Sequence, residues 1–287
     1  MTNRKAVKRQ LKMIRITALM DNMIAENKSL FAEHGLSLLI EKDTHKLLFD
    51  CGQGAHTLAN AHRLGRDLSS LDAVILSHNH YDHAAGFRDY AEQIDGCRLL
   101  YTGPHFFEPK YAFDGLKYTD LSSGFDEAFL NAHNIRHVAV EGIQEIFDGI
   151  CLVSSFPRRC DFETIPGRFV KLTAQGFLPD DFSDEVCLVL DLGDRLCVLV
   201  GCSHPGILNM IRSIHDRFQK PVSAVFGGTH LVEADPERIG KTVRELKEMG
   251  LQIAGFSHCS GSLAEGTAHE DKDLQSCHLG AGDCIYL

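Results

Sequence analysis

The residues with the clearest chemistry form a short cluster directly behind an apolar segment. Residues 77–83 read Ser-His-Asn-His-Tyr-Asp-His, which places four metal-competent side chains close together: His78, His80, Asp82 and His83. The apolar run at 71–76 is typical of a buried strand. In an extended chain residues two apart point the same way, and the residues that follow can turn toward the same space. Imidazoles and a carboxylate suit zinc, iron or manganese, and two pairs of donors predict two ions.

Three later apolar segments, at 196–200, 224–226 and 253–256, lead through short turns to His204, His230 and His258. In α/β sheets ligands gather beyond the carboxyl ends of strands, where loops from different strands converge. We therefore expect His204 and His258 to complete the metal coordination. We give His230, together with Asp82, a catalytic role in contact with the substrate. Any one of these histidines alone would more commonly be a buried, hydrogen-bonded residue, but their repeated position favours a site.

Three further residues have chemistry suited to such a site. Asp50 ends an apolar segment before a glycine turn, so we expect it to accept hydrogen bonds from backbone N–H groups or from a metal-bound histidine. Cys202 and Cys259 stand beside the later histidines. A thiolate can bind zinc or iron or act as a nucleophile, whereas the alternative is a packing thiol. We treat Cys202 as a candidate ligand and Cys259 as a candidate substrate contact.

Composition limits the classes of protein and partner. The 287 residues are 44% hydrophobic, which is enough for a sizeable core, and the formal net charge of −10 argues against nucleic-acid binding through a broad basic surface. No apolar run approaches a membrane span, and no signal peptide is apparent, so we expect neither a membrane partner nor export. Ten cysteines without a secretory signal indicate a reducing compartment, the cytoplasm. The oligomeric state stays open.

The order of elements predicts the architecture. We expect strands at 13–20, 36–40 and 46–49 and a helix at 55–64; later come a strand pair at 186–190 and 196–200, helices at 206–218 and 236–249, and strands at 222–226 and 251–256. Two β-rich halves that each end in helices predict an α/β fold, a four-layer αββα sandwich. Residues 13–287 are predicted to form one domain, after a flexible basic N-terminus at 1–12.

The segment 102–184 is punctuated by prolines and predicted to be mostly loop, with short strands at 135–140 and 150–154. Long loops in compact domains usually carry function, so substrate specificity is expected here. Arg158 and Arg159 are candidate phosphate contacts because a guanidinium matches phosphate oxygens, with solvated surface charge as the alternative. Phe156, Phe162 and Phe169 could line a flat ring or simply pack in the core.

These residues together resemble the metallo-β-lactamase superfamily. Residues 78–83 are similar to its HxHxDH signature, and Asp50 before Cys51-Gly52 is similar to its upstream aspartate. The segments 21–22, 33–37, 201–204, 227–231 and 258–261 resemble the 7,8-dihydropterin-6-methyl-4-(β-D-ribofuranosyl)aminobenzene-5′-phosphate synthase branch, and the likeness extends over nearly the whole chain.

The resemblance implies a four-layer sandwich with a dinuclear site, zinc being preferred over iron or manganese. One ion would be held by His78, His80 and His204, and the other by Asp82, His83 and His258. One departure stands out, because Cys202 occupies the position where most hydrolytic members place a bridging aspartate.

The branch implies a condensing transferase that joins a dihydropterin-methyl diphosphate to a ribosylated aminobenzene phosphate, and thus a small phosphorylated substrate. A second hypothesis is a metal-dependent hydrolase of a phosphodiester, lactone or thioester, which the motif fits directly. A third is a diiron redox protein, but no flavin domain or iron–sulfur cysteine spacing accompanies the ligands. A fourth is a non-catalytic metal-dependent sensor or binding module, which would bind a ligand without turnover.

Overall fold

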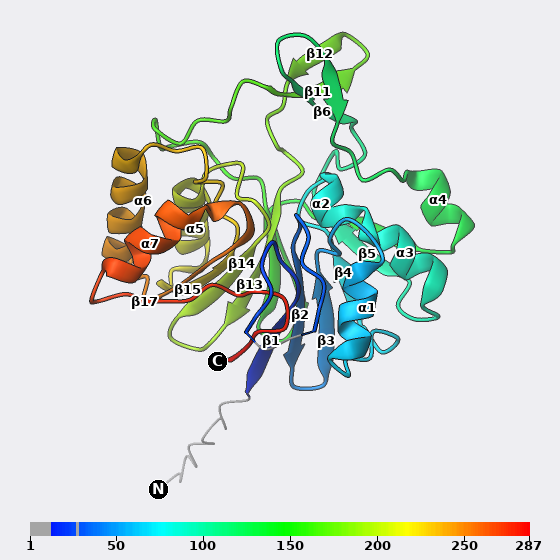
Figure 1. Cartoon of the computed structure of the whole chain (residues 1–287), viewed down its shortest axis with the longest axis horizontal. Helices are drawn as coiled ribbons and strands as arrows, with labels where there is room; N and C mark the ends of the chain where they lie inside the picture. The colour runs from blue at the N-terminus through cyan, green and yellow to red at the C-terminus, as the bar shows by residue number, and fades with distance from the viewer. Residues whose placement is uncertain (1–12, 27–28) are drawn as a thin grey trace, which may run out of the picture.

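Two seven-stranded sheets pack face to face, with helices on both outer sides (Figure 1). The computed structural model describes residues 13–26 and 29–287, so the predicted basic segment 1–12 lies outside the described residues. The predicted four-layer αββα architecture is confirmed. No helix in the described part of the chain is long and apolar enough to cross a membrane.

The first sheet has its strands in the order β18 (Cys284–Tyr286), β1 (Ile14–Met20), β2 (Ser37–Lys42), β3 (His45–Phe49), β4 (Ala73–Ile75), β5 (Leu99–Thr102) and β8 (Arg136–Ala139). Its helices are α1 (His56–Arg63), α2 (Tyr81–Ala84), α3 (Gly86–Gln93) and α4 (Glu127–Ala132). Strands β3, β4, β5 and β8 run parallel, so their carboxyl ends reach the same edge.

The second sheet has the order β17 (Gln275–Ser276), β16 (Ile253–Phe256), β15 (Val222–Gly227), β14 (Leu196–Val200), β13 (Val186–Asp191), β10 (Ile150–Ser154) and β9 (Ile143–Phe147). Its helices are α5 (Ile207–Phe218), α6 (Pro236–Glu248) and α7 (Ser262–Glu270), and a 3-10 turn spans His258–Ser260. The start of α6 is fixed by Asp235, whose side chain accepts a hydrogen bond from the Arg238 N–H, and by Pro236 in the first turn. Strands β14 to β17 are parallel.

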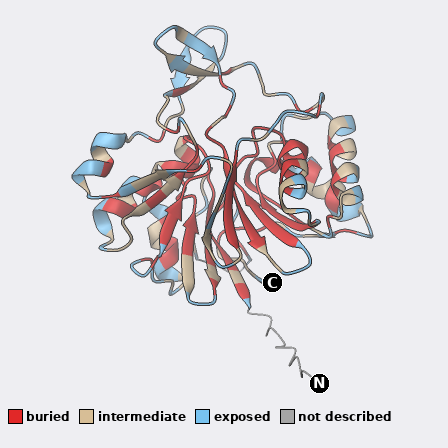
Figure 2. Cartoon of the chain, turned by 180° about the vertical axis from the view of Figure 1, so that it is seen from behind, coloured by how far each residue is buried: buried red, intermediate tan, exposed pale blue. Residues whose placement is uncertain are grey.

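The hydrophobic core has three layers: one between the two sheets, and one between each sheet and the helices that cover its outer face. Residues such as Ile16, Phe49, Leu188 and Leu199 fill the space between the sheets, and separate clusters pack the helices against each outer face. Strands β10 and β14 are buried along their whole length because they carry apolar layers on both faces, which accounts for their unbroken apolar sequences. Figure 2 shows this buried centre and the more exposed helices around it.

A third, four-stranded sheet projects from the sandwich (Figure 1). Its order is β12 (Gly176–Pro179), β11 (Phe169–Thr173), β6 (Lys110–Phe113) and β7 (Tyr118–Asp120), and we call it the projecting sheet. The expectation that 102–184 is mostly loop was wrong here. The apolar residues of this sheet stack on one another instead of joining the main core, as Tyr118 and Phe177 do at 3.9 Å, so no long apolar run marks the strands.

Candidate metal centre

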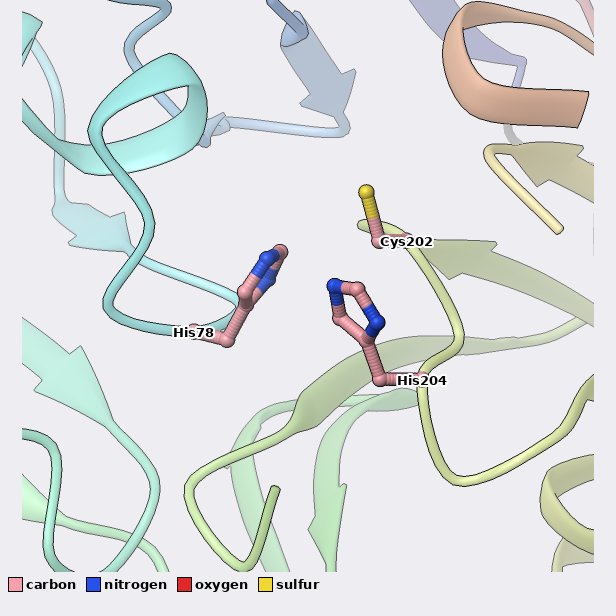
Figure 3. Close-up of side chains that lie close together, drawn as sticks. All are labelled: His78, Cys202 and His204. Atoms are coloured by element: carbon pink, nitrogen blue, oxygen red, sulfur yellow. The ribbon is translucent and has the colours of Figure 1, made fainter. Parts of the chain in front are cut away.

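Loops from both sheets converge beyond the carboxyl ends of β4, β14, β15 and β16. They bring together nine of the predicted residues: His78, His80, Asp82, His83, Cys202, His204, His230, His258 and Cys259. Figure 3 shows His78 from the loop after β4 facing Cys202 and His204 from the loop after β14. All of these side chains are buried except His230, which is partly exposed. These residues meet because each lies in a loop that follows a strand, as the sequence predicted.

His78, His80 and His204 form one group. Their ring centroids lie 4.6, 4.9 and 5.0 Å apart. The Nε2 atom of each ring is buried and has no hydrogen-bond partner among the residues that the structure describes. Burial lowers the pKa of all three histidines well below the ordinary value, which favours the neutral form that binds metals. Three neighbouring rings with buried, unpartnered nitrogens fit a cation.

Asp82, His83 and His258 form a second group. The Nε2 atoms of the two histidines lie 3.1 Å apart, and the Oδ2 atom of Asp82 lies 3.3 Å from His258 Nε2 and 3.7 Å from His83 Nε2. Two imidazoles and a carboxylate that converge in this way suit a divalent ion. His34 adds a further donor, with Nε2 at 3.2 Å from Asp82 Oδ2. The sequence interpretation gave His34 no role, although it lies in one of the segments that carried the resemblance.

Asp50 and Asn22 orient the second group from behind. Asp50 accepts hydrogen bonds from the Ser77 N–H at 2.7 Å, from Ser77 Oγ at 2.8 Å and from His83 Nδ1 at 2.6 Å. Because a carboxylate only accepts, the His83 proton sits on Nδ1 and the Nε2 lone pair faces the group. Asn22 Oδ1 lies 2.9 Å from His258 Nδ1 and orients that ring in the same sense. Asp50 makes both contacts expected from the sequence, one with a backbone N–H and one with a candidate ligand histidine. The role of Asn22 was not predicted from the sequence.

Cys202 lies at the centre of the arrangement. Its Sγ atom is 3.1 Å from His83 Nε2. Donor atoms within 4.8 Å of one another group Cys202 with His78 and His204, again with His83 and His258, and a third time with His230 and Cys259. The thiol therefore occupies the space between the two predicted ligand groups, where a bridging ligand would stand.

The two cysteines differ electrostatically. Burial raises the pKa of Cys202 well above the ordinary value. Burial also opposes ionisation of Cys259, but hydrogen bonds from Cys202 and His230 outweigh it and lower the pKa of Cys259 well below the ordinary value. The pair is thus placed to carry a negative charge on Cys259 beside the imidazole-rich groups.

The backbone of these loops adopts unusual conformations. Asp50, Ser203, His230 and His258 have φ angles of 59°, 58°, 50° and 52°, in the left-handed region that non-glycine residues seldom occupy. Such conformations cluster at functional sites, where the surrounding structure holds them. At Gly201 a Cβ atom would lie 2.1 Å from Ser77 Oγ, so only glycine lets the loop after β14 approach the loop after β4 this closely.

The two predicted phosphate contacts lie in different environments. Arg158 lines a cavity of about 570 Å³ together with Phe182 and Pro205, and it donates to the Asp181 carbonyl at 2.7 Å. No carboxylate in the described part of the chain lies within 4.0 Å of its guanidinium. Arg159 instead pairs with Asp216 at 2.6 Å on the exposed surface. Arg158 and the ligand histidines are thus linked through Phe182, which lines the same cavity as Arg158 and stacks on His204 at 3.8 Å, whereas Arg159 lies outside this cavity.

The three predicted aromatic residues also separate. Phe169, in the projecting sheet, lies over the first ligand group, with ring centroids 5.7 Å from His80 and 5.2 Å from His204. Phe156 lines the cavity that holds Arg158, and Phe162 packs against the core under Lys241. Phe169 is thus the aromatic residue that covers the candidate metal centre.

Comparisons with known proteins agree with this arrangement. The profile of the metallo-beta-lactamase superfamily matches residues 31–117. The chain is 30% identical to 7,8-dihydropterin-6-methyl-4-(beta-D-ribofuranosyl)-aminobenzene-5′-phosphate synthase of Methanocaldococcus jannaschii, over 93% of this chain and 95% of the relative. The chain therefore belongs to the metallo-β-lactamase superfamily.

Solved structures are similar over the same extent. The structure of Tm1679, a metal-dependent hydrolase of the beta-lactamase superfamily, has a TM-score of 0.81 and 28% identity and covers 95% of this chain and 98% of its own. Zinc-bound PqqB from Methylobacterium extorquens, with a TM-score of 0.56 and 11% identity over 94% of this chain and 99% of its own, shares the fold. Fold, ligand groups and family together define a metal-dependent enzyme.

Proposed function

We propose that the chain is a dinuclear-metal enzyme that acts on a small phosphorylated substrate. His78, His80 and His204 would hold one ion, and Asp82, His83 and His258 the other, with Cys202 between them. The observation that carries the proposal is the set of buried Nε2 atoms of His78, His80 and His204, which have no hydrogen-bond partner among the described residues and belong to rings whose centroids lie 4.6–5.0 Å apart. Nitrogen and carboxylate donors favour zinc, and iron or manganese also suit them.

Two divalent ions supply Lewis-acid activation of a phosphate-bearing electrophile. The chain's own residues provide the rest of the site. Asp50 and Asn22 hold the rings of His83 and His258 with their lone pairs inward. Phe169 and Phe182 cover the first ligand group, which keeps bulk water away and strengthens electrostatic interactions beneath them.

The cavity beside the ligand groups supports a phosphorylated substrate. Arg158 lines it with a guanidinium that has no carboxylate partner in the described part of the chain, so the charge is available to an anionic group. Three other cations of the segment 102–184 are engaged in ion pairs: Arg159 with Asp216, Arg168 with Glu233, and Lys171 with Glu108 and Asp181. We assign Arg158 to the phosphate of the substrate.

The reaction we favour is a condensation of the kind named for the Methanocaldococcus jannaschii relative. A dihydropterin-methyl diphosphate would react with a ribosylated aminobenzene phosphate, and diphosphate would leave. A phenyl ring such as that of Phe169 offers a flat apolar surface for a pterin or aminobenzene ring. The similarity to this relative extends over nearly the full length of both chains, which supports the choice.

Hydrolysis is the second candidate. Its support is the structure of Tm1679, which is similar over nearly all of both chains and is described as a metal-dependent hydrolase. The substrate would then be a phosphodiester, lactone or thioester. The two reactions differ in their requirement for a second organic substrate, and this difference provides the test.

The test uses metal-free protein reloaded separately with Zn²⁺, Mn²⁺ or Fe²⁺. Release of diphosphate only when both condensation substrates are present supports the transferase, whereas turnover of generic phosphodiesters without it supports the hydrolase. Tight substrate binding with no turnover under any metal would contradict both and favour a binding module. Arg158→Ala is expected to raise KM for the phosphorylated substrate about 10-fold or more, since hydrogen bonds to charged groups are strong. The neighbouring Arg159→Ala variant serves as the matched control and should leave KM unchanged.

A further inference from the structure

We propose that Cys202, His230 and Cys259 form a third, thiolate-rich metal site, which shares Cys202 with the two ligand groups and binds one borderline or soft divalent ion, with zinc as the biological candidate. This site is additional to the two ligand groups described above. It does not depend on whether the enzyme is a transferase or a hydrolase. It also gives His230 a different role from the substrate contact predicted from the sequence.

The three side chains come from consecutive parallel strands. Cys202 follows β14, His230 follows β15, and Cys259 follows β16, so their loops lie side by side at one edge of the second sheet. One donor atom from each, two sulfurs and one ring nitrogen, lie within 4.8 Å of one another. The His230 N–H also donates to Cys259 Sγ at 3.3 Å, which fixes the loop after β15 against the thiol.

The ring of His230 has no other evident partner. Both of its nitrogens are buried, and apart from the contact with the Cys259 thiol they have no hydrogen-bond partner in the described part of the chain; Nε2 lies 3.7 Å from Glu233 Oε1, beyond hydrogen-bonding distance. Buried polar atoms in proteins are normally satisfied, so a packing role would leave at least one ring nitrogen unexplained. Coordination of an ion by one ring nitrogen accounts for its placement beside the two sulfurs.

The backbone around Cys259 leaves room for its sulfur atom to approach the other two donors. A Cβ atom on Gly228 would lie 2.5 Å from Cys259 Sγ and 2.6 Å from the Gly201 carbonyl oxygen, so a side chain at this position would displace the thiol or the loop. His230 in the site and His258, which precedes Cys259, both adopt left-handed backbone conformations. The loops therefore hold Cys259 in one position, with both thiols buried.

The donor chemistry separates this site from its neighbours. The first two ligand groups offer imidazoles and a carboxylate with Cys202 as their one neighbouring sulfur, whereas this one adds a second sulfur from Cys259. Thiolates select softer ions than carboxylates do, and two sulfurs with a histidine nitrogen are common in tetrahedral zinc sites. Cys202 is shared with the other groups, and a thiolate sulfur has enough lone pairs to bridge ions.

The experiment uses the whole chain, reduced and metal-free, titrated with Cd²⁺. Thiolate-to-cadmium charge transfer in the ultraviolet reports sulfur ligands, and elemental analysis reports bound ions. Wild-type protein should show the absorption of two thiolates, and Cys259→Ala should lose about half of it together with one equivalent of cadmium. Cys160→Ala is the matched control, because Cys160 and Cys259 are both 7% exposed, and it should behave like wild type.

Two further variants keep both thiols and cover the case in which Cys259→Ala fails to fold. His230→Ala should lower the affinity for the most tightly bound, thiolate-coordinated cadmium ion about 10-fold or more, because a ligand is lost. Gly228→Ala should reduce the charge-transfer absorption by displacing Cys259. Full charge-transfer intensity in folded Cys259→Ala, or unchanged cadmium affinity in His230→Ala, would overturn the proposal. Either outcome would leave metal binding by the histidine and aspartate groups, and hence the proposed enzymatic function, intact.

Discussion

The candidate metal centre and the projecting sheet hold their polar side chains in opposite ways. Around the metal centre, carboxylates and amides are buried and directed by hydrogen bonds, as Asp50 is to Ser77 and His83. In the outer part of the projecting sheet the charges are paired near the surface, as Lys171 is with Glu108 and Asp181, and the aromatic rings stack on one another, whereas Lys110 at the base of the sheet is buried in ion pairs with Asp180 and Asp184. The buried hydrogen bonds of the metal centre fix the positions of its ligand atoms, whereas the outer part of the projecting sheet exposes side chains to solvent. We infer that chemistry resides in the first and substrate selection in the second.

The largest effects are expected at the ligands themselves. Replacing His78, His80 or Asp82 by Ala removes a donor from a group whose remaining members depend on it, so metal content should fall and affinity should drop about 100-fold or more. Elemental analysis after dialysis measures the content, and competition with a chelator measures the affinity.

His105→Ala is the control for these variants, because His105 is exposed and lies on the loop after β5, outside the ligand groups. Its metal content should equal that of wild type. Full retention of metal by all three ligand variants would contradict the assignment of these residues as ligands. The candidate metal centre would then no longer differ in function from the projecting sheet.

A smaller loss of metal affinity is expected when a residue that orients a ligand is changed. Asp50→Asn preserves the shape of the side chain but weakens its acceptance of the His83 Nδ1 proton, which fixes that ring's tautomer. Changes of this kind typically cost 10- to 100-fold in metal affinity. The measurement is the same chelator competition. Affinity equal to wild type would show that the buried network supports the fold and has no part in placing the ligand.

The projecting sheet should affect substrate rather than metal. Phe169 covers His80 and His204, so Phe169→Ala is expected to raise KM about 10-fold by removing an aromatic contact, with metal content unchanged. Phe177→Ala, near the exposed end of the same sheet, is the control and should change neither quantity. Loss of metal in Phe169→Ala would erase the distinction between the two regions.

The sequence predicted the two regions unequally, for a physical reason. Ligands such as His78 and His204 could be recognised because each follows an apolar strand, and parallel strands bring their ends to one edge. Asn22 and His34 were not assigned roles, because Asn22 follows the predicted strand at 13–20 but carries an amide, which is not a usual zinc ligand, and His34 precedes the strand at 36–40 and does not follow one. Arg158 and Arg159 are adjacent in sequence, and only the tertiary path of their loop sends one into the cavity and the other to the surface.

The smallest effect concerns the connection between the regions. Arg168, immediately before β11, forms a bidentate ion pair with Glu233, which lies three residues after His230. Both side chains are more than a third exposed, so solvent screens the pair and its coupling energy should be only about 0.2–1 kcal/mol. A double-mutant cycle with Arg168→Ala, Glu233→Ala and the double variant, followed by urea unfolding, measures this energy.

Salt dependence separates this ion pair from the packing around it. Arg168 also lies over the Phe169 ring at 4.2 Å, so Arg168→Ala removes a cation–π contact that Glu233→Ala leaves in place. The cycle cancels that term, and the remaining coupling should shrink toward zero at 1 M salt, where the Debye length is about 3 Å. A coupling that persists at high salt would mean that the pair is desolvated by the loop after β15. The Arg168–Glu233 pair would then be a second buried connection between the projecting sheet and the metal centre, beside the ion pairs of Lys110 with Asp180 and Asp184, and the contrast between the two regions would not extend to their junction.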